Sequence, residues 1–403
     1  MCNHKVHGQE VLEKRYRLAD FFNMHWDTYV KNPKEYIQPG QYKAVNSLRL
    51  CRTAALGIDT YACPDCGEVS EVYHSCKNRF CPTCSWHDTV KWAERVKGQM
   101  LDLPHRHIVF TLPHRLNQIV KENGKYLLNT LMVSSADTLK DWILHKYGVK
   151  VGIISVLHTF GEKKDIHYHV HMIVSWGGLD KSTGVLKAIK GDYVNYDFLK
   201  NKFRCKFEDR LKKLYDSGQL ENRFKDRFSF MRFIREINKK SWMFHIEPPM
   251  EVPSKVVRYI GRYSKRACLS EYKITKMEGE YIGFKYKDYK NVDIEGKPME
   301  KELVMHYRDF FPRLLQHVPL PYFRLVRYYG AYSNRSDIPK EYLYKETNSI
   351  EVPESHNENE LYCSYCKKEK EYQYTYVEKR ETGKRESIKM IYRRLDRIKR
   401  RAA

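Results

Sequence analysis

Two histidines separated by a single residue could begin a metal site: His169 and His171 flank Val170. Alternation along a strand places both imidazoles on one face of a sheet. The other face is an apolar row suited to a core, made of Tyr168, Val170, Met172, Val174 and Trp176. Two neutral imidazoles side by side supply two-thirds of a divalent-metal site. A chance pair is the alternative, since the chain has 17 histidines and similar pairs occur at positions 105 and 107 and at 167 and 169.

A hairpin would bring in the third ligand. Residues 107–112 and 151–160 read as strands, and a polar turn separates the second of these from the histidine strand at 166–176. If the register is centred on the middle of that turn, His158 falls opposite His169, and directly paired Cβ atoms lie only about 5 Å apart. We therefore predict His158 as the third ligand. Glu162 and His167 compete for that role, and a histidine that merely ends a strand is the other interpretation of His158.

Cysteines in the first hundred residues have zinc-ligand spacing. Two Cys-x-x-Cys pairs are separated by fourteen residues, and two such pairs can close a tetrahedral four-thiolate site. Gly67 and Pro82 supply the turns that let paired thiolates bind one ion. The predicted zinc ligands are Cys63, Cys66, Cys81 and Cys84. Cys76 and His74 lie between the two pairs, and either could replace one ligand.

Two tyrosines four residues apart share one face of a predicted helix. The segment 253–266 begins with proline and has apolar residues at helical spacing, which places Tyr259 and Tyr263 side by side. Gly261 between them costs a helix interior about 1 kcal/mol, which suggests a close approach by another group. An aromatic core pair is the alternative in a chain with 31 tyrosines. Basic residues surround the pair, namely Arg258, Arg262, Lys265 and Arg266.

Charge and composition limit the function classes. The 403-residue chain carries a net charge of +23, so a large polyanion is the expected partner. The sequence contains no run of eighteen apolar residues, which favours a soluble, intracellular protein. Cysteines in closely spaced pairs indicate metal binding in a reducing compartment. No phosphate-binding loop of the GxxxxGK[ST] type is present, so nucleotide hydrolysis is not expected.

Five motifs in a fixed order resemble those of a known family. The two cysteine pairs are followed by LPHRHIVFTLPH at 103–114, HTFG at 158–161, HVH at 169–171 and YIGRY at 259–263. This order resembles the rolling-circle transposases of the insertion-sequence ninety-one family, which are two-tyrosine members of the HUH single-strand endonucleases. The resemblance extends over roughly residues 15–335, including the stretch from residue 310 to residue 334.

The resemblance implies a fold, a chemistry and its partners. The fold would be α+β, an HUH endonuclease domain with a central antiparallel sheet flanked by helices, plus a small N-terminal zinc-binding domain. His169 and His171 would bind a catalytic Mg²⁺ or Mn²⁺, and Tyr259 and Tyr263 would be the nucleophiles that form 5′-phosphotyrosine on single-stranded DNA. Some relatives have Gln where His158 stands, which favours His158 as third ligand. Zn²⁺ would be structural, and a host helicase would open the duplex. The protein would act in the cytoplasm, in association with the prokaryotic nucleoid.

The expected organisation has three parts: a helical and zinc-binding region at 1–95, a catalytic domain at 96–338 and a basic tail at 339–403. The tail contains one further pair, Cys363 and Cys366, which cannot close a zinc site alone and could chelate together with a partner subunit. Its basic end predicts contact with phosphate or a solvated charge run. Two other functions compete: a plasmid replication initiator or relaxase of the HUH class, and a non-catalytic zinc-finger DNA-binding regulator.

Overall fold

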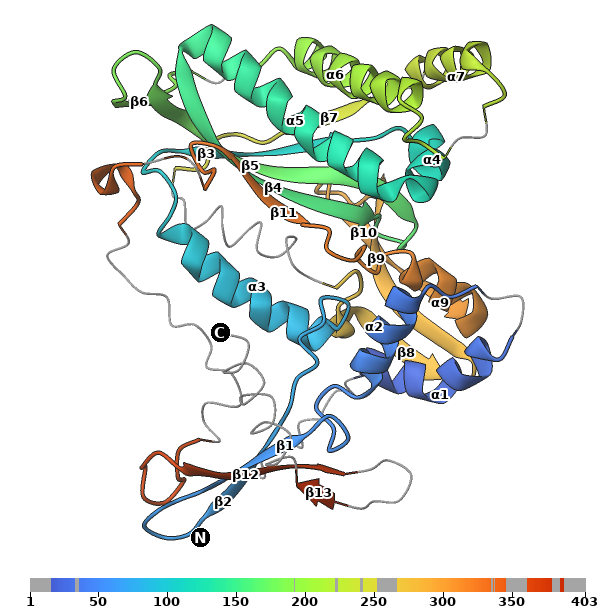
Figure 1. Cartoon of the computed structure of the whole chain (residues 1–403), viewed down its shortest axis with the longest axis vertical. Coiled ribbons are helices and arrows are strands. Elements are labelled where there is room, and N and C mark those ends of the chain that lie inside the picture. The colour runs from blue at the N-terminus through green and yellow to red at the C-terminus, as the bar shows by residue number, and fades with distance from the viewer. Residues whose placement is uncertain are drawn as a thin grey trace.

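A computed structural model describes residues 16–32, 36–191, 193–221, 224–239, 242–251, 267–334, 336, 338–345, 361–378 and 385–387 (Figure 1). Within these ranges the strands form three sheets, of six, four and three strands. Helices cover both faces of the largest sheet (Figure 1). The fold is therefore α+β, as predicted.

The six-stranded sheet is antiparallel throughout. Its order is β11-β4-β5-β3-β7, and β6 pairs with β5. The strands are β3 (His105–Thr111), β4 (Val149–Phe160), β5 (Ile166–Asp180), β6 (Leu186–Ala188), β7 (Met243–Ile246) and β11 (Val326–Gly330). The predicted strands at 107–112, 151–160 and 166–176 thus correspond to β3, β4 and β5. The two longest of these, β4 and β5, form the predicted hairpin in the middle of the sheet.

One face of this sheet carries the main hydrophobic core. The apolar row of β5 is buried, with Val170 fully inaccessible and Trp176 only 2% exposed. It packs under α5 (Gly124–Tyr147), α6 (Tyr196–Asp216) and α7 (Arg227–Asn238), which lie together above the sheet in Figure 1. The short α4 (Asn117–Glu122) precedes α5. Each large apolar side chain buried in this way contributes about 1.5–3 kcal/mol, so this face fixes the orientation of the hairpin.

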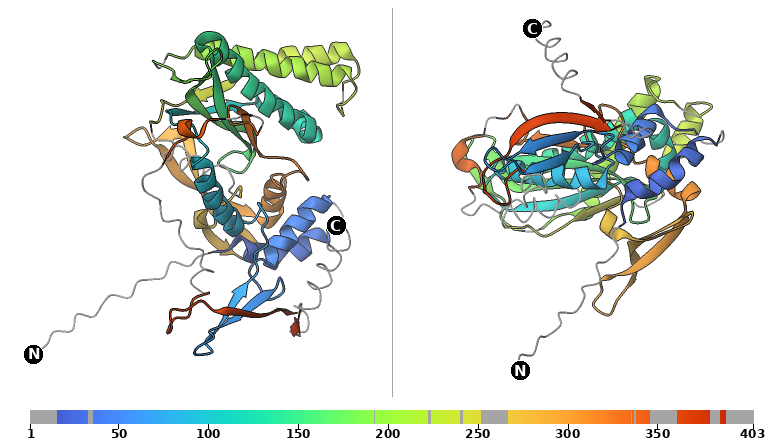
Figure 2. Two further views of the ribbon diagram at one scale, coloured as in Figure 1. Left: turned by 60° about the vertical axis from the view of Figure 1, so that its left-hand side comes forward. Right: turned by 90° about the horizontal axis from the view of Figure 1, so that it is seen from below.

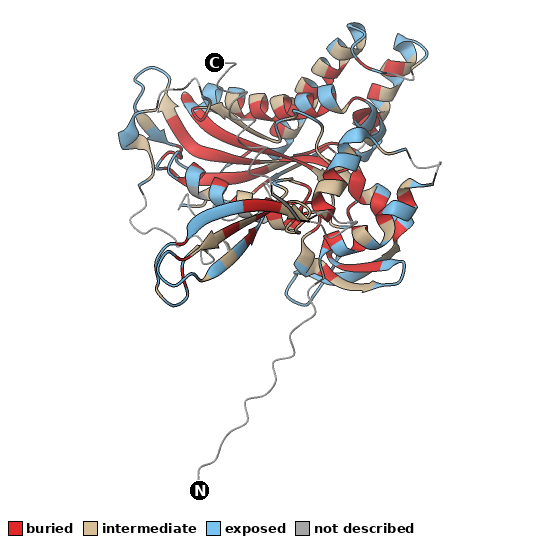
Figure 3. Cartoon of the chain, turned by 60° about the horizontal axis from the view of Figure 1, so that its bottom comes forward, coloured by how far each residue is buried: buried red, intermediate tan, exposed pale blue. Residues whose placement is uncertain are grey.

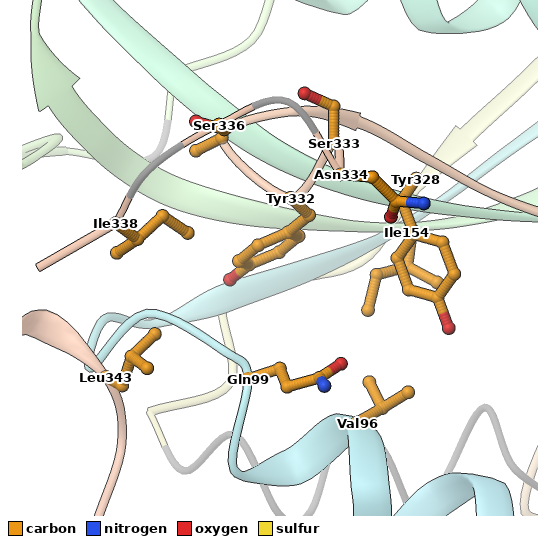
Figure 4. Close-up of a pocket in the computed structure, with 11 residues that line it drawn as sticks. Val96, Gln99, Ile154, Tyr328, Tyr332, Ser333, Asn334, Ser336, Ile338 and Leu343 are labelled. Carbon is orange, nitrogen blue, oxygen red and sulfur yellow. The ribbon is translucent and has the colours of Figure 1, made fainter. Parts of the chain in front are cut away.

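The opposite face lies over α3 (Pro82–Lys97). Trp92 and Val96 of this helix form a smaller core with Ile154 of β4 and Ile173 of β5. Ile173 has the same strand parity as His169 and His171, so the histidines project toward the α3 side of the sheet. A cavity of about 320 Å³ opens between the end of α3 and β11, and Figure 4 shows Val96, Tyr328 and other side chains around it.

The N-terminal helices pack against a late part of the chain. The helices α1 (Leu18–Val30) and α2 (Pro39–Arg49) join α9 (Tyr307–Leu315) and the three-stranded sheet β10-β9-β8. Those strands are β8 (Ile274–Glu278), β9 (Tyr281–Val292) and β10 (Pro298–His306). The ring of Phe22 stacks on that of Phe311, with 4.4 Å between their centroids. This second core therefore anchors the start of the chain beside residues 274–315.

The four-stranded sheet combines the two ends of the described chain. Its order is β13-β12-β1-β2, with β1 (Ile58–Ala62), β2 (Val69–Tyr73), β12 (Glu371–Glu378) and β13 (Arg385–Ser387). Ile58 pairs with both Tyr73 and Tyr376, and Figure 2 shows the red β12 alongside the blue β1. Part of the expected tail is therefore built into the N-terminal sheet. Colouring by burial shows this sheet to be more exposed than the central one (Figure 3).

No helix among the described residues has the length and apolar character needed to cross a membrane.

Candidate functional site

Three histidines converge on the α3 side of the central sheet. His158 of β4 pairs directly with His169 of β5, so the predicted register is confirmed at this position. A bulge between His158 and Phe160 shifts the pairing by one residue closer to the turn. One ring nitrogen from each of His158, His169 and His171 lies within 4.8 Å of the others, and all three residues are buried. This is the arrangement needed to bind one ion from three sides.

The two competing third ligands are not members of this cluster. Glu162 forms an ion pair with Lys273 at 3.1 Å. The ring of His167 packs beside those of His169 and His114, with 5.0 and 5.3 Å between centroids, but it contributes no nitrogen to the group. The geometry therefore groups His158 with His169 and His171, in agreement with the predicted hairpin register.

Hydrogen bonds orient two of the imidazoles. The Nδ1–H of His169 donates to the carbonyl oxygen of His167 at 2.9 Å. Nδ1 of His171 lies 2.8 Å from Nε2 of His107, and Nδ1 of His107 lies 3.1 Å from a carboxylate oxygen of Glu247. The carboxylate favours a proton on Nδ1 of His107, which leaves its Nε2 to accept from His171. Both cluster residues thus direct Nε2 inward, and these two nitrogens are 3.0 Å apart.

His107 and Glu247 were missed by reasoning from the sequence. The signal was present, because positions 105 and 107 form another His-x-His pair on a predicted strand. Whether a histidine of this pair can reach the cluster depends on the order of the strands in the sheet. β3 pairs with β5 on one side, opposing His107 to Ile173, and with β7 on the other, so the His107 ring can bridge from the end of β7 to the cluster.

Burial keeps His169 and His171 uncharged. The pKa values of His169 and His171 lie well below the ordinary histidine value because burial disfavours the imidazolium form, and the neighbouring imidazoles add to this effect. A neutral imidazole is the form that binds metals. Three neutral nitrogen donors fit a divalent transition metal, and they suit Mn²⁺ better than Mg²⁺, which prefers oxygen ligands.

The predicted tyrosine helix lies outside the described residues. This applies to Tyr259 and Tyr263 and to the basic residues Arg258, Arg262, Lys265 and Arg266. The chain on either side is described. Met250 exchanges backbone hydrogen bonds with His105 at 2.8 and 2.9 Å, and Ala267 N–H donates to Ser85 Oγ at 2.9 Å. His105 belongs to β3 of the central sheet, and Ser85 belongs to α3, which lies over the histidine side of that sheet.

Tyr328 and Tyr332 are another pair of tyrosines four residues apart, and both make hydrogen bonds within the fold beside the central sheet. Tyr332 is buried, and its hydroxyl lies 2.6 Å from His105 Nε2 and accepts from the backbone N–H of Leu101 at 3.0 Å. Burial raises the pKa of Tyr332 above the ordinary tyrosine value, which makes it a poorer nucleophile. Tyr328 accepts a hydrogen bond from Trp92 of α3 at 2.9 Å. Figure 4 shows both rings beside the cavity at the end of α3.

The predicted grouping of the cysteines is wrong. Cys63 and Cys66 do not share a site with Cys81 and Cys84; the described residues contain two separate four-cysteine groups. Cys63 and Cys66 lie at the tip of the β1–β2 hairpin, and Cys81 and Cys84 lie at the start of α3 near its base. Strands of five residues hold tip and base about 17 Å apart, too far for one ion. The groups are Cys51, Cys76, Cys81 and Cys84, and Cys63, Cys66, Cys363 and Cys366.

The first group has the dimensions of a zinc site. The Sγ atom of Cys84 lies 3.5 Å from that of Cys51 and 3.6 Å from that of Cys76, and Cys51 and Cys81 are 3.8 Å apart. A tetrahedron with Zn–S bonds of 2.3 Å has edges of about 3.8 Å, whereas a disulfide would bring two sulfurs to about 2.05 Å. Cys76 is thus a full member of this group, and Cys51 is a member that the spacing did not reveal.

Comparison with known proteins identifies the class. Residues 152–339 match the family described as putative transposase, and residues 21–112 match the transposase zinc-binding domain. The first range contains the histidine cluster, and the second contains the whole of the first cysteine group. The chain is thus a transposase with a zinc-binding domain, and its cysteine clusters support structural Zn²⁺.

Individual relatives specify the family. The chain is 30% identical over 326 residues to the putative transposase y4qJ of Sinorhizobium fredii, covering 79% of this chain and 80% of the relative. It is 28% identical over 307 residues to the transposase for insertion sequence element IS801 of Pseudomonas savastanoi pv. phaseolicola, covering 73% and 71%. This chain belongs to the insertion-sequence ninety-one (IS91) family of transposases. No solved structure matches it.

Proposed function

We propose that this transposase cleaves and rejoins single-stranded DNA by metal-dependent tyrosine chemistry, as in rolling-circle transposition. The observation that carries the proposal is the buried cluster of His158, His169 and His171 on one face of a rigid sheet. A non-catalytic DNA-binding protein has no need for three converging, neutral imidazoles. The position of this cluster inside the range that matches the transposase family supports a catalytic role.

The three histidines would hold a Mn²⁺ or Mg²⁺ ion. When bound, the ion supplies Lewis acidity toward the scissile phosphate and fixes its position. The protein orients its own ligands: the His167 carbonyl fixes the ring of His169, and His107 with Glu247 fixes the ring of His171. Such supporting partners hold metal ligands in one tautomer and one orientation.

The nucleophile would be Tyr259 or Tyr263. The phenolic oxygen attacks phosphorus, a tyrosine–phosphate bond forms, and the bond from phosphorus to the 3′ oxygen breaks. The phenol proton is given up and the departing 3′ oxygen gains one, which leaves a 5′-phosphotyrosine and a 3′-hydroxyl. Because one phosphoester replaces another, the reverse attack by a 3′-hydroxyl restores the backbone without ATP. The described residues that flank this segment in the sequence, Met250 and Ala267, contact His105 of β3 and Ser85 of α3.

Two tyrosines would serve the two ends of the element. One would hold the first strand covalently while the other performs a second cleavage or accepts the transferred strand. Arg258, Arg262, Lys265 and Arg266 would contact phosphates, in line with the net charge of +23. The duplex would be opened by a host helicase.

The deciding experiment compares two neighbouring histidines. His169→Ala should abolish metal-dependent nicking of single-stranded oligonucleotides that span the ends of the element, while salt-sensitive DNA binding persists because phosphate contacts supply most of the affinity. His167→Ala is the matched control, since its ring packs against that of His169 but contributes no nitrogen to the group, and its backbone carbonyl is retained. Nicking by His169→Ala at the wild-type rate in excess Mn²⁺ would remove the cluster from the mechanism.

A second experiment tests the nucleophiles. Tyr259→Phe and Tyr263→Phe remove only the attacking oxygen, so each single variant should still form some covalent protein–DNA adduct and fail in complete transposition. The double variant should form no adduct. Undiminished adducts in the double variant, mapped by mass spectrometry to another tyrosine, would show that the nucleophiles are elsewhere.

A further inference from the structure

Two loops far apart in the sequence adopt the same local conformation. In the first, Gly67 N–H donates to the Cys63 carbonyl at 2.9 Å, and Cys63 N–H donates to the carbonyl of residue 68 at 2.9 Å. In the second, Lys367 N–H donates to the Cys363 carbonyl at 3.0 Å, and Cys363 N–H donates to the carbonyl of residue 368 at 2.8 Å. In each loop the backbone therefore forms a tight turn that brings the two cysteines of a Cys-x-x-Cys pair to one position.

The residue after each pair has a left-handed backbone. Gly67 has φ +76°, which glycine adopts freely, and Lys367 has φ +55°, which carries a steric cost for a lysine. Because the second loop repeats the first in spite of that cost, an interaction at this loop must require its backbone shape. A backbone N–H also points at a sulfur, from Cys366 to Cys363 Sγ at 3.3 Å, as expected around a thiolate that ligates a metal.

The two loops face one another. Cys66 Sγ lies 3.4 Å from Cys363 Sγ, and the four sulfurs of Cys63, Cys66, Cys363 and Cys366 all lie within 4.8 Å of each other. Pairing of β1 with β12 continues the contact, since Ala62 opposes Glu371. The loops thus sit at adjacent ends of two paired strands and cannot separate without breaking that sheet.

We propose that these four cysteines bind a second Zn²⁺, which fastens the C-terminal segment to the N-terminal sheet within one chain. Cys363 and Cys366 lie beyond both family-matched ranges, 21–112 and 152–339, so this site is distinct from the one contained in the zinc-binding domain. Two Cys-x-x-Cys loops that meet in this way are a common tetrahedral zinc-ligand set. The earlier alternative, chelation by Cys363 and Cys366 with a partner subunit, is not needed.

Ion pairs surround the four sulfurs and link the two loops. The cationic side chains beside the site, Lys370 and Lys368, each pair with a carboxylate. Lys370 is only 5% exposed, with Nζ 2.5 Å from Ser70 Oγ and 3.4 Å from a Glu68 carboxylate oxygen. Lys368 pairs with Asp65 at 2.6 Å across the two loops. Glu68 in turn accepts from Ser364 N–H at 2.9 Å and from the Cys363 thiol at 2.8 Å, so it ties the second loop to the first. Zinc binding would release that thiol proton.

Zinc content of the purified full-length protein tests the proposal. Elemental analysis should find two zinc ions per chain in the wild type and one in the variant with both Cys363→Ser and Cys366→Ser, a twofold loss. Cys205→Ser is the matched control, since this exposed cysteine belongs to neither group, and it should retain two. Cys66→Ser should also lose one ion, and adding Cys66→Ser to the Cys363 and Cys366 changes should remove no further ion, because all three residues would serve the same site.

Several results would overturn the proposal. One zinc per wild-type chain, or two in the folded variant lacking Cys363 and Cys366, would show that these residues hold no ion. A second ion found only in dimers by light scattering would show that the loops join different chains. If Cys66→Ser fails to fold, the tail variant still decides the matter, because circular dichroism can verify its fold. The outcome does not depend on nicking, so failure here leaves the proposed DNA chemistry untouched.

Discussion

Replacing His107 with phenylalanine should weaken metal binding without touching a proposed ligand. The ring of His107 is 3% exposed, and its Nε2 lies 2.8 Å from Nδ1 of His171. Phenylalanine fills a similar volume but offers no acceptor, so the His171 ring loses the contact that fixes its orientation and tautomer. The proposed ligands all remain, and any change in metal affinity is due to the lost support.

The size of the effect follows from the kind of contact removed. Loss of a group that orients a metal-bound histidine lowers metal affinity about 10–100-fold, or about 1.4–2.8 kcal/mol. Glu247 lies on the far side of His107 at 3.1 Å, so Glu247→Gln should have a smaller effect in the same direction. In His107→Phe, the concentration of Mn²⁺ that gives half-maximal nicking should rise about 10–100-fold. The nicking rate of this variant at saturating Mn²⁺ should recover most of its wild-type value.

His105→Phe provides the matched control. His105 is two residues earlier on the same strand and is also buried, but it contacts the Tyr332 hydroxyl and the Leu103 carbonyl instead of the cluster. This change should lower the free energy of unfolding by about 1–3 kcal/mol, because buried polar partners lose their hydrogen bonds, and should leave the Mn²⁺ requirement unchanged. An equal Mn²⁺ shift in both variants, or none in His107→Phe, would refute the assignment.

Three further outcomes can be measured. The free energy of unfolding of the metal-free protein should fall as pH drops from about 6.5 toward 4. Burial lowers the pKa of His105 and His317 to about 4 in the folded chain, whereas the unfolded chain binds their protons near pH 6.5. By pH 5 each of these two histidines should lower the free energy of unfolding by about 2 kcal/mol. Urea titrations of the wild type and His317→Gln measure this, and identical pH slopes would contradict it. Gly330→Ala should lower the free energy of unfolding by at least about 2 kcal/mol, since Gly330 has φ +62° and an added Cβ would collide with the Val151 carbonyl. Gly296 has a similar φ of +75° but open space around it, so Gly296→Ala should lower it by only about 1 kcal/mol. Thermal unfolding of the two variants measures the difference. Finally, Mn²⁺ should support nicking at lower concentration than Mg²⁺, because three imidazoles are poor ligands for Mg²⁺, and equal requirements in parallel titrations would argue for an oxygen-rich site.

The histidine hairpin could be predicted from the sequence because its determinants are local. Two strands joined by a short polar turn have a register that simple counting fixes, and alternation then determines which side chains share a face. His158, His169 and the apolar row ending at Trp176 all followed from these rules. The bulge beside Phe160 was not foreseen, but it lies on the turn side of the histidine pair and leaves that pair intact.

The cysteine groups and the His107 contact required knowledge of long-range topology. Counting residues joined Cys66 to Cys81 because they are close in sequence, whereas the fold pairs Cys66 with Cys363, 297 residues away. Cys51 has no nearby cysteine partner in sequence and gave no spacing signal. The His107 contact likewise depends on β3 lying between β5 and β7, an order that no local pattern specifies.

The pairing of β1 with β12 has a consequence for synthesis of the protein. Ile58 meets Tyr376 across 318 residues, so a ribosome must translate as far as β12 before β1 gains its second neighbour. A product ended by a premature stop codon after β11 would contain the histidine hairpin but would leave β1 as an open edge. Unpaired strand edges recruit other chains and promote aggregation. Chains that end before β12 would therefore be more prone to aggregate than chains that complete this sheet.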